Sequence, residues 1–464
     1  MNQNEINFCR QVAISEDYED FFATYNILDT FIEQVNPVCY QTAGADYLVF
    51  HQSRDTENPG KYIAQYGYSA IPKVYGLLDT SSVESTGTLR IRRQPYLSLY
   101  GSGVIIGFVD TGIDYRNPLF LNADNTTRIL EIWDQGDQTG ELPQGINYGS
   151  IYTRDQINQA LASENPLDIV PSIDTNGHGT FLAGIAAGNE NPENDFTGMA
   201  PGVDIVSVKL KPAKRYLREY YGISETVPAF ESTDIIMGIH YLFGLATRLR
   251  RPMVICIGLG TNTGDHTGRD FLSSYLDDYA DTDGICIITS AGNEGNLAHH
   301  FRGKLTGIDS VEPMEIRVGQ DENSFRVGIW VSLPNRISIS IVSPTGEVIP
   351  RIPANMRTRV QYNLSFEKSR VIVQYFTNEE RTGDEHIYVQ VEDPIEGVWT
   401  INVYSDTDNS QVFDAWLPME GFISPDTYFI KPDPDLTITQ PGNAMKPITV
   451  TAYNHVNGSI FISA

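Results

Sequence analysis

Apolar residues form short runs, most of them bounded by glycine, between residues 100 and 300 of the chain. The runs stand at 103–109, 254–260 and 284–288. An unbroken apolar run of this length predicts a strand buried on both faces, as in a parallel sheet. Between two of the runs, apolar residues repeat at helical spacing from Ser232 onward, which predicts a helix. Strands alternating with helices predict an α/β fold with a doubly wound parallel sheet.

The pattern changes to strict alternation between about residues 301 and 430. Isoleucine alternates with serine over 337–341, and valine or isoleucine recurs at every second position over 371–373 and 387–391. Alternation of this kind predicts strands with one buried face, separated by turns. We expect an inserted antiparallel β-sandwich, jelly-roll-like, that interrupts the α/β domain.

The first 82 residues predict a small separate α+β unit. The segment 15–22 (Ser-Glu-Asp-Tyr-Glu-Asp-Phe-Phe) has the polar start and early acids of a capped helix, and 47–50 has the composition of a strand. The segment 66–79 then leads toward the α/β domain.

Candidate chemistry begins with His178, which stands in the run Asn-Gly-His-Gly-Thr at 176–180. Small residues follow it at 183–184 and 186–188, so another backbone or a substrate could approach the imidazole closely. Histidine is the side chain whose ordinary pKa suits proton transfer near neutral pH. An incidental histidine in a glycine-rich turn is the alternative interpretation.

Asp110 ends the apolar run 103–109 and precedes Thr111 and Gly112. Open α/β sheets place their functional residues at the carboxyl ends of the strands. A carboxylate there can hold a histidine ring by its second nitrogen. The Asp-Thr-Gly sequence also occurs in aspartic proteases, but these need two such carboxylates, and the nearest second match, at Asp79, lies too close in sequence.

Asn293 follows a third apolar run and stands between Gly292 and Glu294. Its side-chain amide could donate a hydrogen bond to an oxyanion. The alternative is an asparagine that accommodates a left-handed turn.

Together these three motifs resemble those of the subtilisin-like serine proteases, which carry them in the same order. The resemblance implies that Asp110 is the catalytic acid, His178 the general base and Asn293 the oxyanion donor. The segment 198–201 (Gly-Met-Ala-Pro) resembles a further family element.

The strand ending in Gly258, Leu259 and Gly260 resembles the family strand that pairs with bound peptide. These three residues are therefore implied to bind substrate through main-chain hydrogen bonds.

The nucleophile is the departure from the family. The 464 residues contain no Gly-Thr-Ser-x-Ala sequence, although 435–444 and 448–454 resemble the segments that precede it in the family. We interpret this as truncation of a serine endopeptidase and expect the chain as it stands to be inactive.

The layout most resembles clostridial-type subtilases that include the Csp group of germination proteases. It implies a prodomain at 1–82, a subtilase domain at 83–300 with its return segment at 431–464, and the inserted sandwich at 301–430. The prodomain is implied to block the cleft, with self-cleavage expected between Leu77 and Glu84. The implied substrate is a protein cut in a limited way, such as a cortex-hydrolase precursor. No cofactor is implied as required, and bound calcium is left open.

Composition limits the partners. With 32 basic and 59 acidic residues, the net charge of −27 argues against nucleic acid and anionic membranes. No apolar stretch is long enough to span a bilayer, and the first residues lack a secretion signal. The four cysteines have no metal-binding spacing, and Cys256 and Cys286 are expected to be reduced core residues. We expect a cytoplasmic or spore-associated bacterial protein.

Two functions follow from these observations. The first is an endopeptidase; the second is a non-catalytic pseudoprotease that acts as a binding or regulatory scaffold. Asp110, His178 and Asn293 favour the first, because a scaffold has no chemical need for all three.

Overall fold

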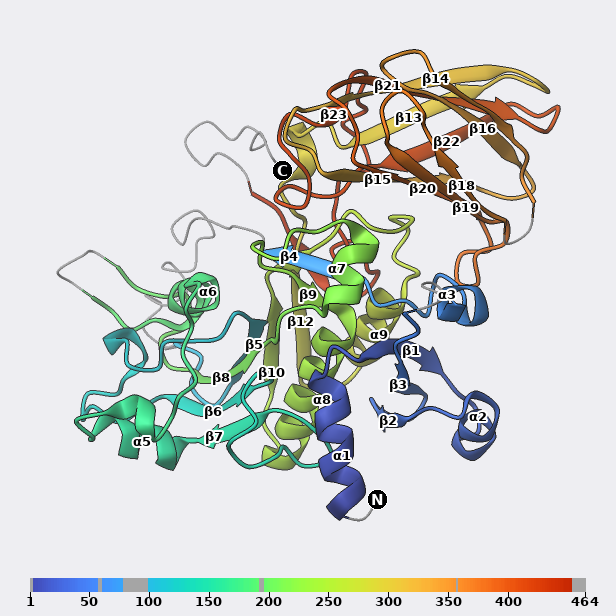
Figure 1. Cartoon of the computed structure of the whole chain (residues 1–464). Helices are drawn as coiled ribbons and strands as arrows, with labels where there is room; N and C mark the ends of the chain where they lie inside the picture. The colour runs from blue at the N-terminus through green and yellow to red at the C-terminus, as the bar shows by residue number, and fades with distance from the viewer. Residues whose placement is uncertain (1–2, 57–60, 78–98, 192–195, 356–357, 453–464) are drawn as a thin grey trace.

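A seven-stranded sheet lies at the centre of the computed structural model, in the strand order β24-β12-β10-β5-β8-β6-β7 (Figure 1). Neighbouring strands are parallel except β6 and β7. The structure describes residues 3–56, 61–77, 99–191, 196–355 and 358–452. The central elements are β5 (Ile105–Asp110), η1 (Pro118–Phe120), β6 (Ile129–Asp134), β7 (Ser150–Thr153), α5 (Arg154–Leu161), η2 (Pro166–Asp168), α6 (His178–Ala187), β8 (Asp204–Lys209), α7 (Arg215–Tyr221), β9 (Phe230–Glu231), α8 (Ser232–Leu249), β10 (Met253–Ile257), β11 (Leu259–Gly260), α9 (Phe271–Ala280), β12 (Ile285–Ser290), η4 (Glu294–Asn296) and β24 (Ile448–Val450).

Helices cover both faces of this sheet. Val109 of β5 shares a buried cluster with Leu242 of α8, whereas its neighbour Phe108 shares another with Leu182 of α6. Successive residues of a strand point to opposite faces, so the apolar run of β5 serves both clusters. The predicted α/β class with a doubly wound sheet is confirmed.

The N-terminal part is built on a three-stranded antiparallel sheet of order β1-β3-β2. Its elements are α1 (Gln3–Ile14), β1 (Tyr18–Thr24), α2 (Leu28–Val35), β2 (Cys39–Thr42), β3 (Tyr47–Ser53), α3 (Lys61–Tyr66) and β4 (Val74–Leu77). The helix predicted at 15–22 is wrong, because most of that segment is β1. Phe21 packs on Phe50 and Phe22 packs on Phe271 of α9, so the strand is buried on both faces.

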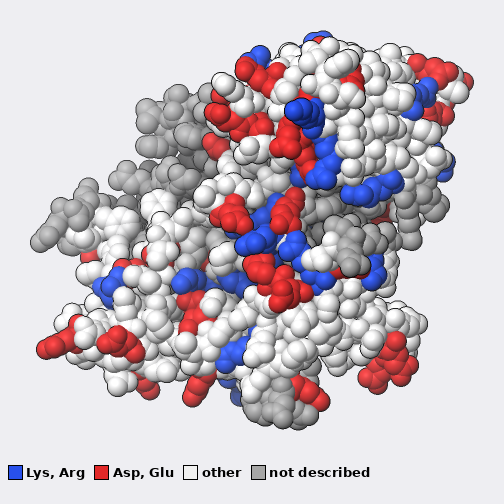
Figure 2. All heavy atoms as spheres, in the orientation of Figure 1, with Lys and Arg blue, Asp and Glu red and all other residues white. Residues whose placement is uncertain are grey.

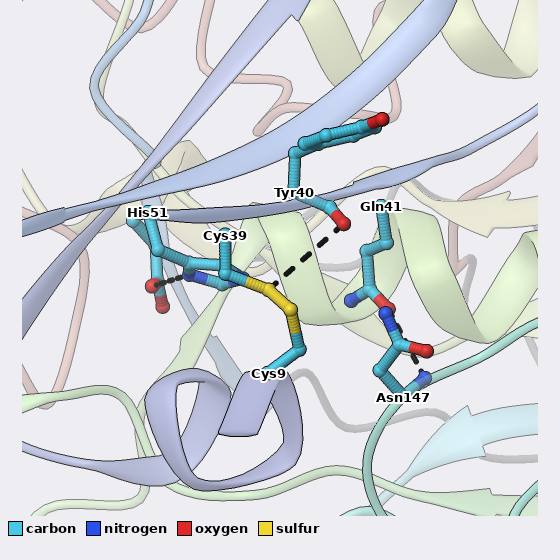
Figure 3. The surroundings of a disulfide bond; sticks show 7 residues. Cys9, Cys39, Tyr40, Gln41, His51 and Asn147 are labelled. Atoms are coloured by element: carbon cyan, nitrogen blue, oxygen red, sulfur yellow. Dashed lines mark hydrogen bonds and ion pairs between the residues drawn. A yellow bond between two sulfur atoms is a disulfide. The ribbon is translucent and has the colours of Figure 1, made fainter. Parts of the chain in front are cut away.

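A disulfide joins Cys9 of α1 to Cys39 of β2 (Figure 3). The sequence does not predict this pairing, because two cysteines 30 residues apart form no recognisable framework. The pairing arises only when α1 packs against the sheet, which brings the two Cα atoms to 5.6 Å. Cys256 and Cys286 carry free thiols and are partly buried.

The part between β12 and β24 consists of two antiparallel sheets, of order β13-β22-β15-β20-β19-β18 and β17-β16-β21-β14-β23. Its strands are β13 (His300–Leu305), β14 (Val311–Val318), β15 (Ser324–Val331), β16 (Ile337–Val342), β17 (Val348–Ile352), β18 (Arg359–Asn363), β19 (Arg370–Phe376), β20 (Glu385–Glu392), β21 (Gly397–Ser405), β22 (Gln411–Trp416) and β23 (Tyr428–Phe429). A single apolar core that includes Trp399 fills the space between the sheets. The predicted antiparallel insertion is therefore present, and we call it the insert.

Charged side chains gather where the N-terminal part, α7 and the insert meet (Figure 2). They line a cleft of about 1140 Å³. Arg54 pairs with Glu219 across the cleft at 2.6 Å, and Arg370 pairs with Glu392 within the insert. Neither Asp110 nor His178 lines this cleft, so it is separate from the residues described next.

Candidate active site

Asp110 is the last residue of β5, at the carboxyl edge of the central sheet. Its side chain is only 1% exposed. The backbone N–H of Thr111 donates to Asp110 Oδ1 at 2.7 Å. The second oxygen, Oδ2, is buried and has no hydrogen-bond partner among the described residues.

His178 is the first residue of α6, and Asp174 fixes the start of that helix. The Asp174 carboxylate accepts hydrogen bonds from the N–H groups of Gly177 at 2.8 Å and Thr180 at 2.9 Å, and from the Thr180 hydroxyl at 2.8 Å. Burial alone would raise the pKa of Asp174, but these hydrogen bonds outweigh it and lower the pKa. Sequence reasoning missed Asp174, although an acid just before a helix start is a recognisable capping signal.

The structure brings Asp110 and His178 together. His178 Nδ1 lies 2.8 Å from Asp110 Oδ1. A β-carbon on Gly179 would lie 2.2 Å from the carbonyl oxygen of Gly112, so only glycine allows this approach of α6 to the end of β5. A buried carboxylate acceptor keeps the proton on Nδ1, which leaves Nε2 as the basic nitrogen.

Gly258 lies against the same pair. A β-carbon there would stand 3.3 Å from His178 Cε1 and 3.5 Å from Asp110 Oδ2. The next two residues, Leu259 and Gly260, form β11, which pairs antiparallel with β4 of the N-terminal part. Leu259 lies opposite Leu77 and Gly260 opposite Gly76. The proposed substrate strand is thus already paired with a segment of the same chain.

On its other side β4 pairs with β9, where Val74 lies opposite Glu231 and Tyr75 opposite Phe230. The three strands form a small sheet of order β11-β4-β9. Of the segment 77–84, in which self-cleavage was expected, only Leu77 lies within the described residues.

Asn293 lies three residues beyond the end of β12 and immediately before η4. Because Ile257 of β10 pairs with Thr289 of β12, the Asn293 loop and Gly258 are at the same edge of the sheet. Among the described residues, no hydrogen bond engages the Asn293 side chain, so its amide has no protein partner there. Its neighbour Glu294 is 2% exposed and accepts from Asn262 Nδ2 at 2.7 Å.

The comparisons with known proteins agree with this geometry. The family model described as the subtilase family, Peptidase S8, matches residues 101–379, which is more than half of the chain. The chain belongs to the subtilase family. The match covers β5, α6, β10, β11 and the Asn293 loop.

Several subtilases resemble the chain in sequence. A subtilisin-like protease of Arabidopsis thaliana, SBT3.6, is 26% identical over 206 residues, which cover 42% of this chain and 26% of the plant protein. The subtilisin of Bacillus sp. (strain TA39) is 23% identical over 50% of this chain and 44% of its own length. The chain therefore spans between a quarter and a half of these two relatives.

The solved structure of the Clostridium perfringens CspB protease resembles this subtilase over more of its length. The two share a TM-score of 0.71 and 28% sequence identity, over 82% of this chain and 75% of that one. The expected likeness to the clostridial group is confirmed.

No cluster of three or more histidine, cysteine or acidic side chains suited to a metal ion occurs in the described part of this subtilase. No helix in the same part has the length and apolar character needed to cross a membrane. His299 and His300, adjacent in sequence, have different partners: His299 lies 2.6 Å from Glu294 and His300 lies 3.1 Å from Asp414.

Proposed function

We propose that this chain carries the acid, the base and the oxyanion donor of a subtilisin-like serine endopeptidase. The observation that carries the proposal is the 2.8 Å contact of His178 with buried Asp110, next to the β11 strand. Asp110 orients the imidazole and stabilises its protonated form, and His178 takes the proton of the attacking hydroxyl. Asn293, together with a backbone N–H, stabilises the tetrahedral oxyanion.

The nucleophile is the part that these residues do not supply. None of the 464 residues stands in a Gly-Thr-Ser-x-Ala sequence. Loss of the nucleophile in subtilisin lowers turnover by about 10⁶, and the remaining rate comes from the oxyanion hole and binding. We therefore propose that the chain as printed does not hydrolyse peptides at a useful rate, and that a segment bearing the serine completes the site.

The N-terminal part acts, in this proposal, as an inhibitor of the cleft. Its strand β4 forms the main-chain hydrogen bonds with β11 that an extended peptide substrate would form. A protein substrate must therefore compete with β4. The proposed substrate is a protein cut at an extended segment.

A binding scaffold is the second candidate function. One observation favours it: β4 occupies β11, where a substrate would bind. A scaffold would use the N-terminal part and the insert as contact surfaces for a partner protein.

The coding sequence beyond the codon for Ala464 separates the two candidates. An open frame that reaches Gly-Thr-Ser-x-Ala supports the endopeptidase, and a stop codon at that point supports the scaffold. Protein made from such an open frame should react with a serine-directed fluorophosphonate and cleave peptides, whereas the 464-residue chain should do neither.

His178→Ala tests the role of the base in the completed protein. It should abolish peptide cleavage and leave the melting temperature near that of the parent. Phe181→Ala, which alters an exposed residue of the same helix, is the matched control and should retain activity. Cleavage that survives in His178→Ala would contradict the assigned role.

For location we propose a spore-associated bacterial protein, as the resemblance to the clostridial germination proteases implies. The Cys9–Cys39 disulfide argues against the reducing cytoplasm, because disulfides persist in oxidising environments. Immunodetection in separated spore and cytoplasmic fractions tests this assignment.

A further inference from the structure

The side chains of β4 alternate between two environments. Tyr75 is fully buried in the core cluster of the central domain, and Leu77 packs against the same cluster. Val74 belongs instead to a cluster that the insert shares, and Gly76 faces the same way. A strand with this alternation presents odd positions to the central domain and even positions to the insert.

Gly76 is in direct contact with the insert. A β-carbon built on it would lie 3.1 Å from Cε and 3.2 Å from Sδ of Met419, and 3.4 Å from Cε1 of Phe422. Met419 is 2% exposed and Phe422 is 8% exposed. An alanine at position 76 would require the tip of Met419 to shift by a few tenths of an ångström. A valine or a larger residue would displace both side chains from a packed environment.

The segment that carries Met419 is fixed to the loop of the oxyanion residue. The backbone N–H of Glu420 donates to Glu294 Oε1 at 2.8 Å. The N–H of Leu417 donates to the carbonyl of His299 at 2.9 Å, and His299 itself lies 2.6 Å from Glu294 Oε2. Since Glu294 is buried and bound on both carboxylate oxygens, the backbone that carries Met419 is held beside this loop.

We propose that Met419 and Phe422 make the substrate position opposite Gly260 selective for glycine. The inference rests on the proposed function, because it assumes that a substrate replaces β4 on β11. The substrate segment then carries glycine at this position and a large apolar or aromatic residue immediately before it, in the place of Tyr75. The insert is thus a specificity element of the peptide cleft.

The test measures peptide binding to the full chain carrying Gly76→Val, in which β4 is weakened as a competitor. Hydrogen exchange at Leu259 and Gly260 should rise in this variant, which shows that β11 has become available. Two fluorescein-labelled peptides are compared by anisotropy, Val-Tyr-Gly-Leu and Val-Tyr-Val-Leu. The internal strand competes equally with both, so the ratio of their affinities reports the subsite alone.

The glycine peptide should bind at least tenfold more tightly than the valine peptide. Adding Met419→Ala should reduce this ratio below threefold by making room for the valine. Equal binding of both peptides to the Gly76→Val chain would overturn the inference of glycine selectivity, while still supporting a peptide-binding cleft at β11. Binding of neither peptide, with β11 exposed by hydrogen exchange, would overturn the proposed function and the inference with it.

The melting temperature supplies a second measurement if Gly76→Val folds poorly. Gly76→Ala should lower it slightly in the parent chain and not at all in a Met419→Ala background. Identical shifts of the melting temperature in the two backgrounds would show that the Met419 side chain does not limit the space at position 76, and would also overturn the inference.

Discussion

Lys214 is predicted to hold the N-terminal part on the central domain. Its Nζ donates to Asp20 Oδ1 of β1 at 2.7 Å, and both residues are only 2% exposed. His51 Nδ1 lies 2.5 Å from the same oxygen. Burial would raise the pKa of Asp20, but the charges of Lys214 and His51 outweigh it and hold the pKa well below its ordinary value.

Lys214→Met removes the cation and leaves the carboxylate buried. Removing one partner of a buried ion pair costs about 3–5 kcal/mol. Because His51 stays beside the same Asp20 oxygen, we expect the lower end of this range. At about 1.4 kcal/mol per tenfold change, about 3 kcal/mol equals a fall of roughly two orders of magnitude in the protection of buried amides. We expect this fall in the amides of β1 and β3, measured by native-state hydrogen exchange of the full chain.

Two further variants make the test specific. Lys61→Met removes the partly exposed pair of Lys61 with Asp55 and should leave the protection of these amides nearly unchanged, because exposed ion pairs contribute little to stability. Asp20→Leu combined with Lys214→Met and His51→Leu replaces the whole buried polar cluster with apolar groups and should recover most of the protection. A loss in Lys214→Met no greater than that in Lys61→Met would refute the reasoning.

Two other predictions concern the insert and the disulfide. Burial raises the pKa of Glu385 from 4.5 to about 7, so the folded state holds this proton more tightly and stability falls as pH rises from about 4.5 through 7. The free energy of unfolding of Glu385→Gln should therefore equal that of the parent at pH 4.5 and exceed it at pH 8 by about 3 kcal/mol, measured by denaturant unfolding. A variant whose stability depends on pH as the parent's does would contradict this. Cys9→Ser opens a link across 30 residues and should cost about 3–4 kcal/mol of stability under oxidising conditions. The stability difference between Cys9→Ser and the parent should vanish when dithiothreitol reduces the disulfide. A difference that persists would show that the lost stability comes from side-chain packing and not from the disulfide.

The central fold could be predicted because its local signals agree with its final environment. The apolar run of β5 is buried on both faces, and α8 begins at Ser232, where the helical spacing begins. The helix prediction for 15–22 was wrong because the acids of this segment suggest a helix start, whereas Phe21 and Phe22 pack on residues of β3 and α9. Such partners are distant in sequence and override local propensity.

The candidate site was predictable to the extent that it lies in short motifs. Asp110 and His178 each stand in a recognisable local sequence, and the parallel sheet brings them together. The contact of Gly76 with Met419 could not be read in the same way. It joins residues from opposite ends of the chain, and its basis is the way the insert packs over β4.

The sheet of order β11-β4-β9 also bears on how the polypeptide is made. Within the described residues, each outer strand of that sheet pairs with β4 alone, so a chain without β4 would present two unpaired edges. Exposed edges of this kind invite pairing between molecules. Because β4 precedes β9 and β11 in the sequence, synthesis from the N-terminus delivers the protecting strand first. A central domain expressed without residues 1–77 would emerge with these edges open and prone to self-association.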